Sequence, residues 1–344
     1  MSLPAAGTQE KPAIKPCQNF EGHTKWVNGV IHLPGGQQIM TSSWDGSLRV
    51  WNLRSGKQIA HDWQDEEDPM NTIALSPDGK KVVGGSMNGV VRLWNVNIDT
   101  GKAAEWTGHT KYVTSVCWNR DSERVVSGSE DGTARVWDVE SGRTVLAIET
   151  RFREVAAVSY SPDTTMIATG GENKEKEFLK IWDANTSKIV SNIIKGHTEK
   201  VKCLAWTADG RTLISGASDK SIRMWNTATW QQIKVLTEHA GNVEAIAISP
   251  NGHILASASW DNTARLWNLE NGQPIGSPLQ HTVSVDSVSF STDGKLLATG
   301  CWDNNAYSWD ISMIVREAGL DELLQNPNVS LLFLISLYQL NSLS

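Results

Sequence analysis

The chain has 344 residues, with 31 lysines and arginines against 38 aspartates and glutamates, a net charge of −7. This mildly acidic balance makes nucleic acid an unlikely partner, because phosphate binding requires a basic surface. The four cysteines are far apart and form no C-x-x-C pair, so neither a zinc site nor a disulfide framework is indicated.

Residues 1–12 are small and polar, without the apolar core of a secretory signal, and we expect them to form a disordered lead. An intracellular protein, cytoplasmic or nuclear, is therefore predicted. The cysteine usage agrees with such a reducing compartment.

From residue 13 to residue 311 the chain repeats one unit of roughly 43 residues. Each unit ends in Trp-Asn or Trp-Asp, and the tryptophan recurs as Trp51, Trp94, Trp137, Trp182, Trp225, Trp267 and Trp309. The intervals are 43, 43, 45, 43, 42 and 42 residues. A period this constant indicates one supersecondary module used seven times.

Each unit contains short β-rich runs separated by turns such as Asp-Gly or Asn-Gly, which is typical of hairpins. In the fifth unit the runs are residues 201–206, 212–216, 221–225 and 232–236. Residues 14–20 precede the first unit and have no earlier repeat to complete. We expect them to add the outermost strand to the last repeat, which would close a ring and remove an exposed sheet edge.

Five units share a histidine, a hydroxyl, an aspartate and a tryptophan at fixed offsets. The sets are His23, Thr41, Asp45 and Trp51; His109, Ser127, Asp131 and Trp137; His197, Ser215, Asp219 and Trp225; His239, Ser257, Asp261 and Trp267; and His281, Thr299, Asp303 and Trp309. An enzyme needs one nucleophile, whereas this set occurs five times with Thr replacing Ser. We therefore predict a structural hydrogen-bond network and no catalytic residues.

Gly-His near the start of a unit and Trp-Asp at its end resemble the WD-repeat (WD40) family of β-propellers. The resemblance covers residues 13–311 and rests on pairs such as Gly108-His109 and Trp137-Asp138. It implies an all-β fold, a seven-bladed propeller of four-stranded antiparallel blades in which these tetrads tie each blade together. It also implies a role in assembling multi-protein complexes.

Units two and four depart from the pattern, and we expect their blades to be looser. Unit two has Glu66, Gly84 and Asn88 where the histidine, hydroxyl and aspartate are expected. Unit four has Arg151 near the histidine position and a longer charged loop at residues 171–178.

After the last repeat, residues 312–327 predict a short amphipathic helix. Residues 328–344 form a strongly apolar tail that we expect to be poorly ordered; a tail that binds a partner or touches a membrane is the alternative. The apolar run is shorter than the roughly 20 residues that a bilayer-spanning helix needs, so no membrane span is predicted.

Aromatic residues gather on one predicted rim, in the loops between second and third strands and at the entry to the first strands. Ring closure makes units six, seven and one neighbours, and tryptophans stand in all three of their loops. The predicted partner-binding residues are Trp26, Trp44, Tyr112, Glu130, Trp260 and Trp302. Pooled aromatics on a solvent-facing rim indicate an interaction hot spot, although each indole could instead pack over its neighbouring loop.

These patterns predict a non-enzymatic scaffold for other proteins or peptides, with no cofactor, metal or small-molecule substrate. Two alternatives stay open. One is a specific peptide or ubiquitin reader that uses the aromatic arc at the channel mouth. The other is a propeller hydrolase, although the sequence has no phosphate-binding loop, His/Cys ligand cluster or nucleophile elbow.

Overall fold

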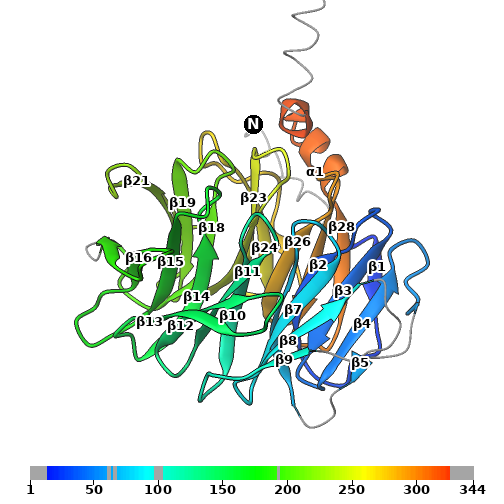
Figure 1. The fold of residues 1–344 in the computed structure, drawn as a ribbon. Coiled ribbons are helices and arrows are strands. Elements are labelled where there is room, and N and C mark those ends of the chain that lie inside the picture. Colours follow the sequence, from blue (N-terminus) through cyan, green and yellow to red (C-terminus); the bar gives the residue numbers. More distant parts are fainter. Residues whose placement is uncertain (1–13, 60–62, 65–67, 97–103, 192–193, 326–344) are drawn as a thin grey trace, which may run out of the picture.

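A computed structural model describes residues 14–59, 63–64, 68–96, 104–191 and 194–325. Seven four-stranded antiparallel sheets, the blades, surround a central axis (Figure 1). This arrangement confirms the predicted seven-bladed propeller. The predicted lead, residues 1–12, the tail, residues 328–344, and Glu66 lie outside the described residues.

The innermost strand of each blade contacts the innermost strands of both neighbouring blades and so lines the axis. These strands are β2 (Val27–His32), β6 (Met70–Leu75), β10 (Val113–Trp118), β14 (Glu154–Tyr160), β18 (Val201–Trp206), β22 (Val243–Ile248) and β26 (Val285–Phe290). The second strands are β3 (Gln38–Ser43), β7 (Lys81–Ser86), β11 (Arg124–Ser129), β15 (Met166–Glu172), β19 (Thr212–Ala217), β23 (Ile254–Ser259) and β27 (Leu296–Cys301).

The third strand of each blade ends at or next to the recurrent tryptophan. The third strands are β4 (Ser47–Asn52), β8 (Val91–Asn95), β12 (Thr133–Asp138), β16 (Leu179–Asp183), β20 (Ile222–Asn226), β24 (Thr263–Asn268) and β28 (Ala306–Asp310). The outermost strands are β5 (Trp63–Gln64), β9 (Ala104–Trp106), β13 (Thr144–Glu149), β17 (Ile189–Ser191), β21 (Gln232–Leu236), β25 (Leu279–Gln280) and β1 (Gln18–Phe20).

The first strand of the chain closes the ring, as predicted. β1 pairs antiparallel with β28 (Figure 1). Gln18 lies opposite Ser308, and Phe20 lies opposite Ala306. Phe20 is fully buried, and its ring centroid lies 6.0 Å from that of Trp51 in the first blade. The outer edge of the last blade is thereby covered by the start of the chain.

All seven hairpins between first and second strands contain a register shift near the start of the first strand. In each case one residue of the first strand has no partner opposite it. The seven residues, which we name the bulge ring, are Asn28, Asn71, Thr114, Ala156, Lys202, Glu244 and Asp286. A β-bulge increases local twist and redirects the side chain of the extra residue.

The C-terminal helix is shorter than the predicted residues 312–327. α1 (Ile311–Glu317) is capped by the carboxylate of Asp310, which accepts from the Met313 amide at 2.9 Å. Gly319 then takes a left-handed φ of +72°, and a single 3₁₀ turn, η1 (Asp321–Leu324), follows. Gly319 separates the two short helical segments because its conformation cannot continue an α-helix. Neither helical segment in the described residues has the length and apolar character needed to span a bilayer.

Candidate functional site

In blade one the four tetrad residues form a continuous chain of hydrogen bonds. His23 Nδ1 donates to the Asp45 carboxylate at 2.9 Å, and His23 Nε2 accepts from the Thr41 hydroxyl at 2.7 Å. The indole of Trp51 in turn donates to Thr41 Oγ1 at 2.8 Å. The same contacts, at 2.7–2.9 Å, recur in blades three, five and six.

The aspartates of these four tetrads are held in the ionised form. For Asp131, burial opposes ionisation, but the hydrogen bonds from His109 and Thr133 lower its pKa well below the usual range. The Ser127 hydroxyl that joins histidine and tryptophan is fully buried. It is therefore placed to hold strands together rather than to attack a substrate.

The fifth predicted tetrad, in blade seven, differs from the other four. His281 Nδ1 donates to the backbone carbonyl of Leu279 at 3.0 Å instead of to Asp303. The Asp303 carboxylate accepts from the Tyr307 hydroxyl at 2.7 Å. Tyr307 stands two residues before Trp309, where the other units carry arginine or lysine, and it captures the aspartate. Thr299 still joins the histidine and the tryptophan, at 3.0 and 3.1 Å.

Blade two replaces the tetrad with a buried ion pair. Arg92 Nη1 donates to the carboxylate of Asp68 at 2.5 Å, and both side chains are almost fully buried. Asp68 Oδ1 also accepts from the Asn88 backbone amide at 3.1 Å, which fixes the loop. Asp68 is not among the predicted site residues. The signal was available, because the arginine two residues before Trp94 needs an acidic partner if it is buried.

Blade four uses a lysine in a related way. Lys180 Nζ donates to the Thr150 carbonyl at 2.9 Å, lies 3.0 Å from the Glu177 carboxylate and sits 4.8 Å from the centroid of the Phe152 ring. Arg151, which lies near the expected histidine position, is exposed. The blade thus keeps a polar anchor for its third strand without a histidine.

Four of the six predicted partner-binding residues form one aromatic cluster, which we name the aromatic arc: Trp26, Trp44, Trp260 and Trp302. Trp26 and Trp302 are stacked, with ring centroids 4.3 Å apart and planes at 4°. Trp44 packs on Trp26 at 4.9 Å, and Trp260 meets Trp302 edge-on at 5.3 Å. Trp260 is 41% exposed, whereas the other three are partly buried, chiefly against one another.

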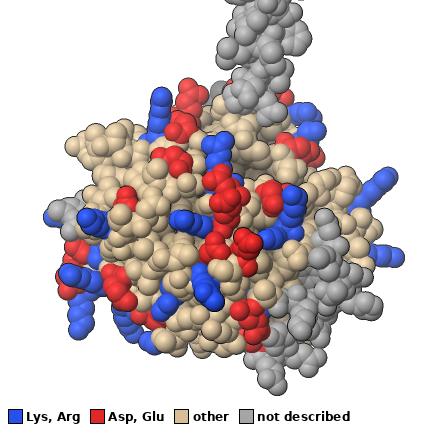
Figure 2. Space-filling view, viewed as in Figure 1, with Lys and Arg blue, Asp and Glu red and all other residues tan. Residues whose placement is uncertain are grey.

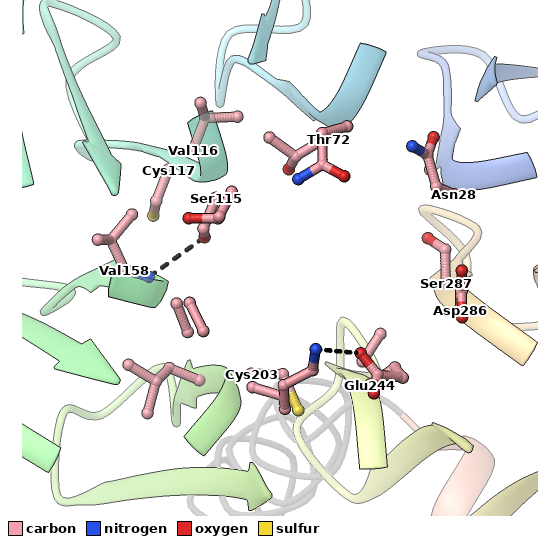
Figure 3. Close-up of a pocket in the computed structure, with 18 of the residues that line it drawn as sticks. Asn28, Thr72, Ser115, Val116, Cys117, Val158, Cys203, Glu244, Asp286 and Ser287 are labelled. Atoms are coloured by element: carbon pink, nitrogen blue, oxygen red, sulfur yellow. Dashed lines mark hydrogen bonds and ion pairs between the residues drawn. The ribbon is translucent and has the colours of Figure 1, made fainter. Parts of the chain in front are cut away.

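The aromatic arc stands at one mouth of a cavity of about 530 Å³ that runs along the propeller axis. All seven residues of the bulge ring line this cavity, and Trp44 lines it too. Figure 3 shows the inner-strand residues Asn28, Glu244 and Asp286 placed around the same opening. The bulges bring polar and charged side chains to the axis from strands that are otherwise largely apolar.

The other two predicted residues, Tyr112 and Glu130, also line the cavity, from blade three. Tyr112 is 40% exposed, and its carbonyl accepts from the Glu130 amide at 3.0 Å. They do not join the aromatic arc. Together with Trp44 they border one shared opening with an indole-rich side and a more polar side.

Asp286 links the bulge ring to the aromatic arc. Its carboxylate accepts from the indole of Trp260 at 3.2 Å and, through a shorter bond, from the indole of Trp302. Burial raises the pKa of Asp286 to about 6, and the nearby Glu244 carboxylate adds to this effect against the two indole hydrogen bonds. Its charge is therefore sensitive to pH near neutrality.

Glu244 and Lys202 form an ion pair within the bulge ring, with Lys202 Nζ 3.0 Å from Glu244 Oε2. Although burial disfavours its charge, the Glu244 carboxylate raises the pKa of Lys202 above its usual value. Lys202, Glu244 and Asp286 are not among the predicted site residues. Each is the second residue of a largely apolar first strand. A charged residue at this recurrent position could have indicated a polar site.

Among the described residues, no group of three or more His, Cys, Asp or Glu side chains is arranged to hold a metal ion. On the face shown in Figure 2, lysines and arginines are interspersed with aspartates and glutamates. That face offers no continuous basic patch of the kind that nucleic-acid binding uses.

Six segments match the family described as WD domain, G-beta repeat: residues 14–52, 57–95, 102–138, 188–226, 230–268 and 272–310. The fourth unit is not among them, in keeping with its altered polar anchor and longer loop.

Three similar proteins illustrate the relationship. Serine-threonine kinase receptor-associated protein of Gallus gallus is 30% identical over 82 residues, 24% of this chain and 22% of that protein. Anaphase-promoting complex subunit cdc20 of Dictyostelium discoideum is 33% identical over 22% of this chain and 16% of its own length. Periodic tryptophan protein 2 of Arabidopsis thaliana is 27% identical over 27% of this chain and 10% of its own length. The alignments thus span at most 22% of the length of these three relatives.

Proposed function

The chain belongs to the WD40-repeat family, and on that basis we propose that it is a non-enzymatic platform that binds a protein partner through its aromatic arc. One observation carries the proposal: four indoles from three adjacent blades form a single cluster at the channel mouth, with Trp260 41% exposed. An exposed aromatic cluster with a polar edge has the composition of an interface hot spot.

The names of two relatives support this reading. They describe a receptor-associated protein and a subunit of the anaphase-promoting complex. Both names refer to association with other macromolecules. All four cysteines of the present chain are free thiols, which supports the proposed intracellular setting, in cytoplasm or nucleus.

A hydrolase function receives no comparable support. In blades one, three, five and six the tetrad hydroxyls are fully buried and already bond both a histidine and an indole. A nucleophile must reach its substrate, so these residues serve better as blade fasteners.

The test is affinity capture of a partner by the full chain, followed by binding measurements with single variants. Trp44→Ala, Trp260→Ala and Trp302→Ala should each weaken binding by about 1–4 kcal/mol. None of these residues belongs to a tetrad, so the variants should stay folded.

Trp230→Ala is the matched control. Trp230 is also a partly buried surface tryptophan, but it lies between β20 and β21, at the opposite end of the blade. A partner whose affinity ignores all three arc substitutions, or responds equally to Trp230→Ala, would contradict the proposed contact surface.

A further inference from the structure

Building on the proposed function, we propose that the channel mouth receives a positively charged side chain, lysine or arginine, from the bound partner. The receiving groups are the bulge-ring carboxylates Glu244 and Asp286, next to the indole of Trp260. The inference follows from the way in which the seven bulge-ring positions satisfy their polar groups.

In blades one to three, the polar side chain at the bulge-ring position donates a hydrogen bond to a backbone carbonyl of the next blade. The Asn28 amide donates to the Met70 carbonyl at 2.5 Å, and the Asn71 amide donates to the Val113 carbonyl at 3.2 Å. The Thr114 hydroxyl donates to the Val155 carbonyl in the same way. This part of the ring fastens neighbouring blades together and leaves no requirement for a ligand.

Blade four interrupts this pattern, because Ala156 has no polar side chain. Blades five to seven then carry the three charged members, Lys202, Glu244 and Asp286. Lys202 continues the pattern by reaching the next blade, where it pairs with Glu244 Oε2. The two carboxylates that follow contact the preceding blade, Glu244 through Lys202 and Asp286 through Trp260, and among the described residues neither has a hydrogen bond or ion pair to the following blade.

Glu244 gives the strongest indication that the channel mouth binds a donor group from a partner. Its Oε1 atom is fully buried and has no hydrogen-bond partner among the described residues. A buried carboxylate oxygen without a donor is costly, and such a group in a native protein calls for a donor from outside the chain. A lysine ammonium or an arginine guanidinium supplies both the donor and the opposite charge.

The charge balance of the cavity favours the same ligand. Among the described residues, the carboxylates of Glu130, Glu154, Glu244 and Asp286 line it, against the two ammonium groups of Lys200 and Lys202. Each lysine is paired, Lys200 with Glu154 at 2.5 Å and Lys202 with Glu244 at 3.0 Å. Excess negative charge therefore remains at the mouth, and both oxygens of Asp286 are directed at indole N–H groups.

The indoles add a second, independent attraction for a cation. Lys202 Nζ lies 5.7 Å from the centroid of the Trp260 ring, so this ring already makes a cation–π contact within the chain. Trp260 is also the most exposed member of the aromatic arc. An incoming cation beside Glu244 Oε1 would combine a charge-assisted hydrogen bond with a cation–π contact.

The experiment uses the full chain and fluorescent seven-residue peptide pools at pH 7 and 0.15 M salt. The central residue is fixed as Arg, Lys, Gln or Glu, and the remaining positions are randomised among uncharged residues. Anisotropy titrations should give about tenfold tighter binding for the Arg and Lys pools than for the Gln pool, as one charged hydrogen bond predicts. Comparing Arg with Lys identifies the preferred cation.

Two neighbouring substitutions should act in opposite directions. Glu244→Gln should reduce the preference for the cationic pools to less than about twofold, because it removes the receiving charge. Lys202→Gln should increase that preference, because it removes the internal competitor for Glu244. Loss of folding cannot produce both results. Glu123→Gln, the same charge change at an exposed residue between β10 and β11, is the matched control and should change nothing.

Equal binding of the Gln and Arg pools, binding of no pool, or indifference to Glu244→Gln would overturn the cation inference. Trp260→Ala separates this failure from failure of the proposed function. If Trp260→Ala weakens partner binding while Glu244→Gln has no effect, the aromatic contact surface stands and only the cation is wrong. If Trp260→Ala also has no effect, both proposals fail.

Discussion

Trp26 and Trp302 lie face to face, 4.3 Å apart, although they come from the first and last repeats of the chain. The pairing of β1 with β28 makes those two blades neighbours. The aromatic arc is therefore a product of ring closure, and whatever opens the ring should also separate these two indoles.

The first prediction concerns that closure. Deleting residues 1–21 removes β1, and Phe20→Ala removes its buried anchor, so both should destabilise the propeller. Phe20→Ala should lower the free energy of unfolding by about 3–5 kcal/mol, measured by urea denaturation. Glu21→Ala, at an exposed neighbouring position, is the control. A deletion variant that melts with the full-length protein would show that β1 does not hold the ring.

The second prediction compares two aspartates at equivalent positions. Asp131→Ala removes the acceptor of a buried histidine and should cost about 1–3 kcal/mol of stability. Asp303→Ala should cost less, because His281 bonds the Leu279 carbonyl instead. Equal losses in urea denaturation would mean that the histidine–aspartate bond contributes little to blade stability.

Blade two supplies a third prediction. Asp68→Ala removes the buried carboxylate 2.5 Å from Arg92 Nη1 and should cost about 3 kcal/mol. Glu105→Gln changes an exposed acidic contact of Arg92, at 3.2 Å. Because Glu105 is 54% exposed, this substitution should cost under about 1 kcal/mol. Thermal melts of both variants compare the two losses of stability. A smaller loss for Asp68→Ala than for Glu105→Gln would contradict the prediction.

The fourth prediction is a pH dependence at Asp286. Its pKa is raised to about 6 in the folded protein, so folding favours the protonated acid. That contribution to stability is fully present below the ordinary aspartate pKa of 3.8 and is lost as pH rises through 6.

Ionisation should therefore shift the indole N–H resonances of Trp260 and Trp302 between about pH 5 and pH 7. Two-dimensional ¹H–¹⁵N spectra measure this directly. Asp286→Asn should abolish the transition, whereas the control Asp303→Asn should leave it in place. Indole resonances that stay constant across this range would show that Asp286 does not titrate there.

A fifth prediction addresses Glu130, on the polar side of the mouth. Because it is partly exposed, its charge should act through long-range attraction rather than through a desolvated contact. Glu130→Ala should change the association rate of the captured partner, and the difference should shrink as salt is raised from 0.05 to about 0.5 M. A change confined to the dissociation rate would contradict this role.

The repeat period predicted the architecture, because each unit must bury its apolar faces against the next and seven such units form a ring. In blades one, three, five and six, hydrogen bonds join the residues that stand at the constant offsets. Offsets alone did not reveal Tyr307 as the partner of Asp303, because His281 and Tyr307 compete for one carboxylate and only their distances decide.

The loops that carry Trp44, Trp260 and Trp302 were readable from the numbering, and ring closure placed them on adjacent blades. The sequence could not determine which indoles stack on each other and which stays exposed. Those outcomes depend on side-chain packing between blades that are distant in the chain. Trp26 is enclosed by two other indoles, while Trp260 keeps an open face.

The sequence marks the charged residues of the inner strands, but tertiary structure decides that they line the channel. In an alternating strand, the second residue of β22 or β26 has no evident reason to face the axis with a charge. A bulge in every inner hairpin turns that residue toward the cavity, and closure of the ring brings Lys202, Glu244 and Asp286 together. Local sequence determined the blades. The site exists because a backbone irregularity and a long-range closure place charges from separate repeats around one axis.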